Sequence, residues 1–398
     1  MKAQKLRIAQ IVSPWIAVPP KDYGGTERVV FDLTETFITD GHSVTLFASG
    51  DSHTHAPLHY VWKKSLTRSN ISWDKYEMAQ VHMEKSFAKA IKPLGGSGKK
   101  PTYKYDIIHF HLSSNSDLVA FELASKSPIP VICTLHSRFP FDRRKGHLAE
   151  RDAYYLQWWK SLPLVAISKQ AREDARKSAI GDLRFMKIIS HGLSESDFIK
   201  DTDTERNNLV WVGRIVPDKG THIVLEVAIK LGIPLRFGGI VDKHVPEAVE
   251  YFNGVIRPLL KKHKDLLTFV GKVTSKERAR LLSSGLIFLN PMQWDEPFGL
   301  VMIEAMAQGC PVIAFNRGAA MEIVKSGVSG VLVDTADEMA EKVSEIIETI
   351  DRKALVAWAH EHYSIQEVAD KYIKAYGQAI RAYKKEKRDL KKKKVGTY

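Results

Sequence analysis

"WDEPFGLVMIEAMAQGCPV" stands at residues 294–312, and its pattern predicts the local fold. The residues before it, 283–290, contain an apolar block that is typical of a buried parallel strand. After Pro297 the apolar residues recur at helical spacing as far as Gly309, and both residues suit these places, proline at a helix start and glycine after a helix end. Residues 311–315 indicate a further strand. The stretch therefore predicts a strand, a loop, a helix and a second strand.

Two glutamates interrupt this apolar run. Glu296 would lie in the loop at the carboxyl end of the strand, and Glu304 on the helix, roughly a turn and a half from its start. In an open parallel sheet, ligands bind at this edge, and the free N–H groups of a helix start attract anions such as phosphate. The alternative is a buried glutamate paired with a neighbour, or a solvated helix face. The stretch by itself leaves both open.

The whole chain repeats this alternation of strand and helix, which predicts an α/β fold with parallel sheets. Its 398 residues are long for one core and sufficient for two domains of about 200 residues each. A polar stretch at 194–208 marks the boundary. We expect two Rossmann-like domains facing each other across a cleft, at residues 1–195 and 205–365, with a closing helix and basic tail at 366–398 that crosses back to the first domain. The strands are expected at 6–12, 42–49, 106–112, 130–136, 163–168, 186–192, 209–215, 235–240, 267–273, 283–290, 311–315 and 330–334.

The net charge of +13 is concentrated at the end of the chain. Residues 384–394 hold eight Lys or Arg and two Glu or Asp, so +6 of the +13 lies there. Such a run is usually a solvated, frayed helix end, which we favour. Peripheral contact with an anionic membrane stays open, and nucleic acid is the alternative that we favour least.

Cysteine usage and hydropathy indicate a cytoplasmic protein. Cys133 and Cys310 each lie in an apolar, strand-like context, as buried small hydrophobic residues of a reducing compartment do. The apolar run 6–12 is followed by prolines, which does not fit a signal peptide, and no stretch approaches ~18 consecutive apolar residues.

Two cations follow the strand expected at 209–215. In "GRIVPDKG" (213–220), Arg214 and Lys219 flank a short loop that leads into a helix. A guanidinium fork and an ammonium point charge beside a helix start would suit a diphosphate. Two solvated loop cations are the alternative.

Taken together, these motifs resemble the family 4 glycosyltransferases of the GT-B fold. The resemblance covers roughly residues 6–380 in the expected order, and the two glutamates around Pro-Phe-Gly, with Arg and Lys upstream, are its most specific part. The matching motifs are YGGTERVV (23–30), DIIHFH (106–111), TLH (134–136), AIS (166–168), HG (191–192), GR (213–214), KG (219–220), EPFGL (296–300), EA (304–305) and GCPV (309–312).

The resemblance implies roles for residues of the second domain. Glu304 would accept hydrogen bonds from the ribose hydroxyls of a nucleotide sugar, and Glu296 would lie beside the donor sugar. Arg214 and Lys219 would hold the diphosphate. The backbone amides that would contact the sugar and phosphates are those of Phe298, Gly299 and Leu300.

In the first domain the resemblance implies a glycine-rich loop and a histidine. Gly24 and Gly25 would let the backbone approach the phosphates, since they lack a Cβ atom. His136 would point into the cleft near the sugar. The aromatic and basic stretch 137–159 would shape the acceptor side.

The chemistry implied is retaining transfer of a hexose from a UDP- or GDP-sugar to a hydroxyl of a glycan, lipid-linked sugar or small molecule. Such enzymes need charge stabilisation of the leaving diphosphate more than an acid or base. The resemblance therefore implies no metal ion and no cofactor besides the nucleotide sugar as co-substrate. The alternatives are another GT-B-like enzyme, either a nucleotide-sugar epimerase or a phosphorylase, and a non-enzymatic basic protein that binds nucleotide or nucleic acid.

Two further motifs are less convincing as sites. Asp201 and Asp203 form a D-x-D pattern of a kind that binds metal and nucleotide diphosphate in another glycosyltransferase fold, but they lie in the polar boundary, so we interpret them as linker. His109 and His111 share one face of a strand, which suits a metal, but no third ligand is near in sequence. A core or cleft-lining role is favoured for both.

Two departures from the family pattern concern single positions. Asn290 replaces the serine that is common at the end of its strand, and His191 stands where asparagine is frequent before Gly192. Both put local donor contacts in doubt.

Overall fold

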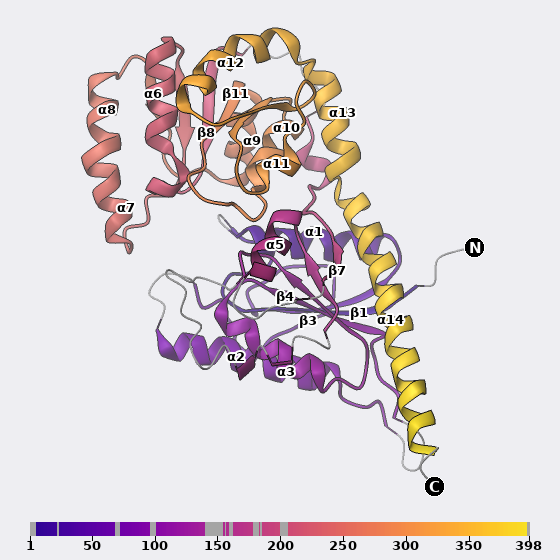
Figure 1. The fold of residues 1–398 in the computed structure, drawn as a ribbon. Helices are drawn as coiled ribbons and strands as arrows, with labels where there is room; N and C mark the ends of the chain where they lie inside the picture. Colours follow the sequence, from indigo (N-terminus) through magenta and orange to yellow (C-terminus); the bar gives the residue numbers. More distant parts are fainter. Residues whose placement is uncertain are drawn as a thin grey trace. The chain divides into compact units, whose positions relative to one another are not determined.

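The protein forms two compact units (Figure 1). This computed structural model describes residues 5–21, 24–67, 72–95, 101–139, 154–155, 157–158, 162–177, 183, 185–199 and 206–395. Unit 1 comprises Met1–Ser190 and Val368–Tyr398, and unit 2 comprises His191–Glu367. Each unit contains one parallel sheet.

The sheet of unit 1 has the strand order β3-β2-β1-β4-β5-β6-β7, and every recorded pair is parallel. The order reverses between β1 and β4, which are neighbours in the sheet. Strands β4 and β5 are buried along their whole length, as their apolar sequences indicate. The strands are β1 (Arg7–Val12), β2 (Ser43–Phe47), β3 (Leu58–His59), β4 (Ile107–Leu112), β5 (Val131–Leu135), β6 (Leu164–Ala166) and β7 (Phe185–Ile188).

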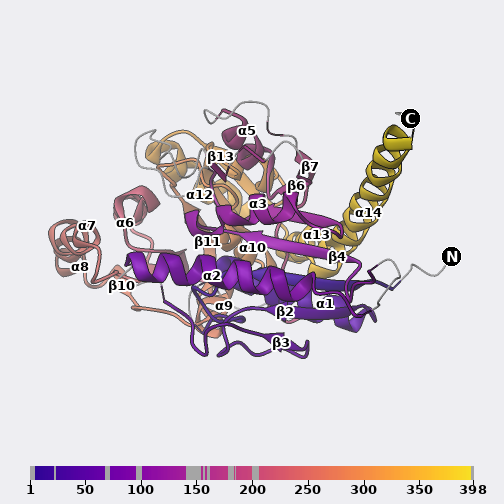
Figure 2. The same cartoon turned by 90° about the horizontal axis from the view of Figure 1, so that it is seen from below.

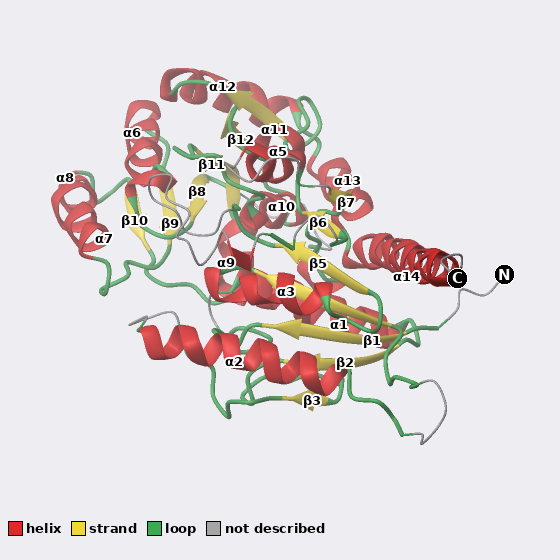
Figure 3. Ribbon diagram, turned by 60° about the horizontal axis from the view of Figure 1, so that its bottom comes forward, coloured by secondary structure: helices red, strands yellow, loops and turns green. Residues whose placement is uncertain are grey.

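Helices cover both faces of this sheet (Figure 3). On one face lie α2 (Trp73–Ala90) and α3 (Val119–Ser125), and Phe87 of α2 packs on Phe110 of β4 with ring centroids 6.0 Å apart. On the other face lie α1 (Gly25–Thr39) and α14 (Ile365–Val395). Phe37 of α1 contacts Tyr376 of α14, with ring centroids 5.8 Å apart. Helix α5 (Lys169–Lys177) connects β6 and β7, and a 3-10 turn, Asn115–Leu118, precedes α3.

The long helix α14 returns the chain to unit 1, to which its residues from Val368 belong (Figure 2). The basic segment expected as a tail continues this helix as far as Val395. Residues 384–390 and Lys392 are exposed, as a solvated helix end requires. Contact of these cations with a membrane stays a prediction. Within the described ranges, no helix has the length and apolar character needed to cross a membrane.

The sheet of unit 2 has the order β10-β9-β8-β11-β12-β13, again parallel throughout, and it reverses between β8 and β11. Helices α6 and α12 pack together, and α10 packs against both α9 and α13. The strands are β8 (Asn208–Val212), β9 (Leu235–Gly238), β10 (Leu267–Phe269), β11 (Gly285–Asn290), β12 (Val312–Phe315) and β13 (Gly330–Val333). The helices are α6 (Thr221–Leu231), α7 (Pro246–Tyr251), α8 (Arg257–Lys262), α9 (Ser275–Ser283), α10 (Leu300–Ala307), α11 (Ala320–Ile323), α12 (Ala336–Thr349) and α13 (Arg352–Tyr363), with a π-helical turn at Phe252–Ile256 and 3-10 turns at Glu195–Asp197 and Pro217–Lys219.

Each sheet therefore has one point where the strand order reverses, β1/β4 in unit 1 and β8/β11 in unit 2. In open parallel sheets the crevice for ligands lies outside the carboxyl ends of the strands at such a point. The loops that follow β1, β8 and β11 are consequently where a site is expected, and the predicted residues Gly24, Arg214 and Glu296 lie in these loops.

Candidate active site

The loop from β8 to α6 brings its two cations to the carboxyl end of β8. Arg214 follows the strand by two residues and is exposed, and within the described part of the chain its side chain makes no hydrogen bond or ion pair. Lys219 ends a 3-10 turn and is largely buried. Gly220 comes next, with φ 67°, and a Cβ atom there would lie 2.1 Å from the carbonyl oxygen of Pro291. Only glycine therefore allows this loop to approach the loop after β11 so closely.

The loop from β11 to α10 is held in place by backbone contacts. The Gln293 amide donates to the carbonyl of Asp218 at 2.8 Å, which joins this loop to the β8–α6 loop. The Ala319 amide donates to the carbonyl of Glu296 at 2.9 Å. Phe298 is buried, and its ring lies against His191, with centroids 4.8 Å apart. The aromatic residue of the Glu-Pro-Phe-Gly motif therefore anchors the loop in the core of unit 2.

Helix α10 begins later than the sequence suggests. Gly299, with φ 91°, is its N-cap, and Leu300 is its first residue. Pro297 was expected at the helix start but lies three positions before Leu300, in the loop, so that detail of the prediction is wrong. The physical reason is that the left-handed backbone at Gly299 turns the chain into the helix, a conformation that favours glycine. The end is as predicted, with Gly309 in the left-handed region at φ 64°.

The helices that start at the expected ligand edges have uncapped N-termini. Helices α1, α6 and α10 have glycine at the N-cap, namely Gly24, Gly220 and Gly299, and no side chain caps any of them. In contrast, α9, α12 and α13 begin with side-chain caps from Thr274, Thr335 and Asp351. The first N–H groups of a helix have no intrahelical acceptor, so an uncapped start presents them to an anion.

Lys219 and Glu296 form an ion pair, which brings two of the predicted site residues into contact. Both side chains are more than four-fifths buried, with 15% and 17% of their surfaces exposed. The Lys219 ammonium also lies over the Trp294 ring, 5.5 Å from its centroid. A charge-assisted hydrogen bond at this depth fixes both groups beside the start of α10.

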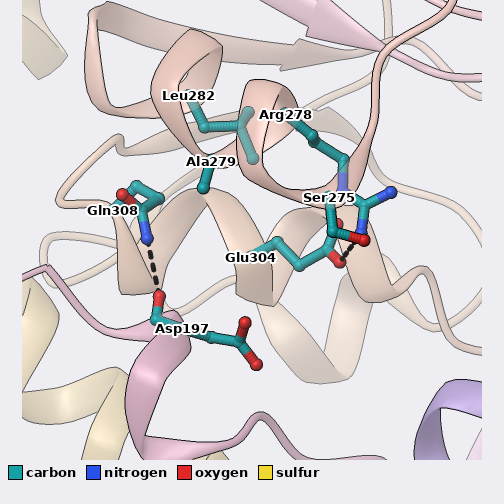
Figure 4. Close-up of a pocket in the computed structure, with 7 residues that line it drawn as sticks. All are labelled: Asp197, Ser275, Arg278, Ala279, Leu282, Glu304 and Gln308. Carbon is teal, nitrogen blue, oxygen red and sulfur yellow. Dashed lines mark hydrogen bonds and ion pairs between the residues drawn. The ribbon is translucent and has the colours of Figure 1, made fainter. Parts of the chain in front are cut away.

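Glu304 pairs with a different cation, Arg278 of α9, through an Nη2–Oε1 distance of 2.7 Å. Figure 4 shows the two side chains pointing toward each other in a pocket of unit 2. Gln308 of the same pocket donates from Nε2 to the carbonyl of Asp197 at 2.6 Å. The other lining residues are Ser275, Ala279 and Leu282. One oxygen of Glu304 is thus engaged by Arg278 in a small pocket with polar and apolar sides.

Arg278 is a site residue that the sequence analysis missed. It lies four positions before the buried Leu282, on the inward face of α9, where an arginine needs a buried acceptor. The spacing of Arg278 four residues before the buried Leu282 is the signal that could have identified it.

In unit 1 the predicted residues lie at the carboxyl ends of β1 and β5. Gly24 and Gly25 begin α1, and a Cβ atom on Gly24 would lie 2.7 Å from Oε2 of Glu27 and 2.9 Å from Cβ of Pro20, so a side chain does not fit. His136 follows β5 directly and is 6% exposed. These three residues belong to a different unit from Lys219 and Glu296.

The two less convincing motifs differ in their outcome. His109 and His111 are both fully buried on one face of β4, with ring centroids 3.9 Å apart, in a core role. Asp201 and Asp203 lie outside the described residues, as does most of 137–159.

In the part of the chain that the structure describes, no group of three or more His, Cys, Asp or Glu side chains could hold a metal ion. Both cysteines are buried as predicted, and burial raises the pKa of Cys310 to about 12.

Comparison with known proteins connects this geometry to a family. A model described as Glycosyltransferase Family 4 matches residues 23–192, and one described as Glycosyl transferases group 1 matches residues 194–360. The chain belongs to the family 4 glycosyltransferases. The two matches lie end to end and between them contain all of the predicted site residues.

Individual proteins resemble this glycosyltransferase over nearly its full length. Spore coat protein SA of Bacillus subtilis is 23% identical over 93% of this chain and 99% of its own. Sucrose-phosphate synthase from Thermosynechococcus elongatus has a TM-score of 0.73 at 20% identity, covering 94% of this chain and 100% of that one. Anabaena Alr3699/HepE in complex with UDP has a TM-score of 0.69 at 16% identity, covering 94% and 100%. The structural likenesses show the GT-B fold, with one Rossmann-like domain in each unit.

Proposed function

We propose that this glycosyltransferase is a retaining, metal-independent enzyme that moves a hexose from a nucleotide-diphosphate sugar to a hydroxyl of a glycan, lipid-linked sugar or small molecule. The observation that carries the proposal is the cluster at the β8/β11 reversal point. There Lys219, paired with Glu296, lies beside the uncapped starts of α6 and α10, with Arg214 exposed in the same loop. Two cations and two helix starts at one edge form a site for a diphosphate.

Of the two candidate donors, we favour a UDP-sugar over a GDP-sugar. Support comes from Anabaena Alr3699/HepE, which has been solved with UDP and with UDP-glucose and shares the fold of this chain. In this proposal Glu304, which lies on α10 and lines the pocket, accepts hydrogen bonds from the ribose hydroxyls. Glu296 and the amides of Phe298, Gly299 and Leu300 contact the sugar and the phosphates.

The proposed reaction needs charge stabilisation at the leaving group. The bond between the sugar C1 and the phosphate oxygen breaks, and its electron pair stays on the diphosphate. The acceptor oxygen bonds to C1 on the same face, and its proton moves to the departing phosphate oxygen. Arg214, Lys219 and the helix-start amides stabilise the charge that develops there, which is the task a metal ion performs elsewhere.

A nucleotide panel tests the donor site. Calorimetry compares UDP, GDP, ADP and their common glucose and mannose conjugates, with EDTA present. We expect only the nucleotides of one base to bind, and the uridine nucleotides are the first candidates. Glu304→Ala should weaken that binding by more than about tenfold, because the ribose loses hydrogen bonds to a charged acceptor. Binding that needs a divalent cation, or that is indifferent to Glu304, would contradict the proposal.

Arg278→Gln is expected to weaken binding of the same nucleotide about tenfold. Arg278 engages Oε1 of Glu304 and so fixes the orientation in which the second oxygen can accept from ribose. A glutamine side chain still has a hydrogen-bond donor, but it lacks the positive charge and is shorter than the arginine side chain that contacts Glu304. Arg280→Gln is the matched control, since Arg280 is exposed on the same helix. Equal effects of the two substitutions on the dissociation constant would show that Arg278 acts only through the net charge.

A further inference from the structure

Three of the eight tryptophans of the chain, at positions 15, 62 and 73, lie in one part of unit 1. Trp15 follows β1 by three residues, and Trp73 is the first residue of α2. The rings of Trp15 and Tyr76, the latter on α2, meet edge to face with centroids 5.5 Å apart. The start of α2 therefore lies at the carboxyl end of β1, the strand at which the order of this sheet reverses, where ligands are expected.

The rings form a small cluster of their own beside the main core of unit 1. Trp15 is buried, and Trp62 and Tyr76 pack in the same cluster while they stay partly exposed. The indole nitrogen of Trp15 donates to the hydroxyls of Ser114 and Ser116 at 3.2 and 3.0 Å. That of Trp62 donates to a backbone carbonyl of α2 at 2.8 Å. Two of the three indoles are thus fixed in place and form a rigid base.

Trp73 differs from the other two because its side chain lies mostly in solvent. It is 76% exposed, the highest value among the large hydrophobic residues that the structure describes. Its ring lies against that of Tyr76, with centroids 6.4 Å apart and an interplanar angle of 51°. Tyr76 therefore supports the indole and leaves most of its surface in water. An exposed aromatic ring on a rigid base, at the ligand edge of a sheet, is typical of a binding site.

Two polar side chains beside these rings lack a hydrogen-bond partner. Gln80 lies on the same stripe of α2 as Trp73 and Tyr76, and its Nε2 is buried without an acceptor. Asn115 lies between the two serines that hold Trp15, on the 3-10 turn that packs against α2. Its Oδ1 is buried without a donor. Orphaned polar atoms are rare in native proteins, so a donor and an acceptor without partners at one edge of a sheet call for an explanation.

A pyranose ring matches this combination of groups. Its C–H groups carry a small positive charge and pack on the negative face of an aromatic ring. Its hydroxyls both donate and accept, so they suit the amide nitrogen of Gln80 and the amide oxygen of Asn115 alike. Both residues are partly exposed, so a change of rotamer can bring either amide to the surface. Asp74 and Glu77 lie beside Lys75 on the same two turns, so the surface does not favour an anionic ligand.

We infer that Trp73, Gln80 and Asn115 form a carbohydrate subsite, in which a neutral pyranose ring stacks on the indole and its hydroxyls bind the two amides. All three residues belong to unit 1, and binding at this subsite requires no residue of unit 2. Only the role of the bound sugar rests on the proposed function, in which it is part of a glycan acceptor. The subsite adds to that function a class of acceptor, one that contains a neutral sugar ring.

Proton–nitrogen NMR of the full chain labelled with ¹⁵N-tryptophan tests the subsite with free sugars. The probes are maltose, cellobiose and mannobiose, and Trp73→Phe assigns the indole signal of Trp73. At least one disaccharide is expected to shift this signal in a saturable manner, while the signal of Trp358 in unit 2 stays unchanged. The proposal is overturned if none of the three disaccharides shifts the Trp73 signal.

Substitutions of Trp73 separate stacking from a general loss of apolar surface. Trp73→Ala should weaken binding of the tightest disaccharide about tenfold, and Trp73→Phe only about twofold, because a phenyl ring still offers an aromatic face. Saturation transfer to the sugar measures both variants. Leu94→Ala is the matched control, since Leu94 is 61% exposed beyond the other end of α2. Equal weakening by Trp73→Ala and Leu94→Ala would contradict the subsite.

Gln80→Met gives a readout that a purely structural residue would not. Methionine has nearly the same volume but no amide, so sugar binding should weaken several-fold. The midpoint of urea unfolding should not fall, because the free protein loses no hydrogen bond of Nε2. A lower unfolding midpoint at unchanged sugar affinity would show that Gln80 only packs, and would remove it from the subsite.

The same labelled protein identifies any other occupant of this surface. A Trp73 signal that responds to vesicles of phosphatidylcholine but not to sugars would assign the surface to lipid. A signal that changes only with protein concentration would assign it to a second copy of the chain, and either result overturns the proposal. The nucleotide panel keeps the proposed function separate: sugar binding without nucleotide binding defeats that function and leaves the subsite, and the opposite pair of results defeats the subsite alone.

Discussion

Lys219→Gln is expected to lower kcat for sugar transfer by about 10²–10³-fold, the usual cost of removing one electrostatic contact to a developing charge. Lys219 is held between Glu296 and the Trp294 ring at the start of α6. Such fixed charge needs no rearrangement as the diphosphate departs, and its low exposure strengthens it relative to a solvated cation. Most of the loss should appear in kcat, because the charge on the leaving oxygen is larger in the transition state than in the bound donor.

Lys230→Gln is the matched control for this prediction. Lys230 also belongs to α6 and forms an ion pair, with Asp337 at 2.7 Å, but the two side chains are 54% and 80% exposed. Exposed pairs of this kind contribute little, so kcat should change less than twofold and the free energy of unfolding should stay nearly unchanged. Steady-state kinetics with the identified donor measures both variants. A rise in KM at unchanged kcat for Lys219→Gln would mean that this cation binds the donor without stabilising the transition state.

The strands of both sheets could be predicted because buried parallel strands read as continuous apolar runs. The run at 283–290 became β11, and its neighbour at 311–315 became β12. Strand β3 was missed since its two residues, Leu58–His59, are too short for a pattern. The helical segment from Pro246 to Lys262 was not predicted either, because Gly254 and Pro258 interrupt it and part of it forms a π turn.

Motif positions could be read from the sequence, but the contacts between them could not. Lys219 and Glu296 are 77 residues apart, and they meet because β8 and β11 are adjacent at the reversal of strand order. The partner of Glu304 was missed because Arg278 reaches it from a helix with no motif of its own. A fold resemblance gives the edge on which a site lies, whereas its ion pairs depend on side-chain packing that spacing does not encode.

The free energy of unfolding is expected to fall as the pH drops from 6.5 toward 3, in part because of His191. Burial lowers the pKa of His191 from 6.5 to about 3 in the folded protein. Between these values the unfolded chain binds a proton that the folded chain does not, so stability is fully present above pH 6.5 and is lost as the pH falls. The slope from this one group is up to about 1.4 kcal/mol per pH unit, or roughly 2–3 kcal/mol by pH 4.5.

His191→Asn should remove this part of the pH dependence. Asparagine does not titrate and is the residue that the family resemblance finds frequent there. Urea unfolding of the full chain at several pH values, followed by tryptophan fluorescence, measures the difference between the two proteins. His82 and His109, whose pKa values burial also lowers, act alike in both and cancel. Above pH 7 the two stability curves should run parallel, which serves as the internal control.

Acid should also weaken the candidate site before the protein unfolds, because the His191 ring packs directly on Phe298 in the β11–α10 loop. A proton on that ring places a buried charge against the aromatic anchor of the loop, and the start of α10 is expected to shift with it. Nucleotide affinity should therefore fall as the pH approaches 3 in the natural protein, where the folded state takes up this proton, and stay more nearly constant in His191→Asn. Identical affinity profiles for the two proteins would show that the buried histidine acts on stability alone and does not affect the loop.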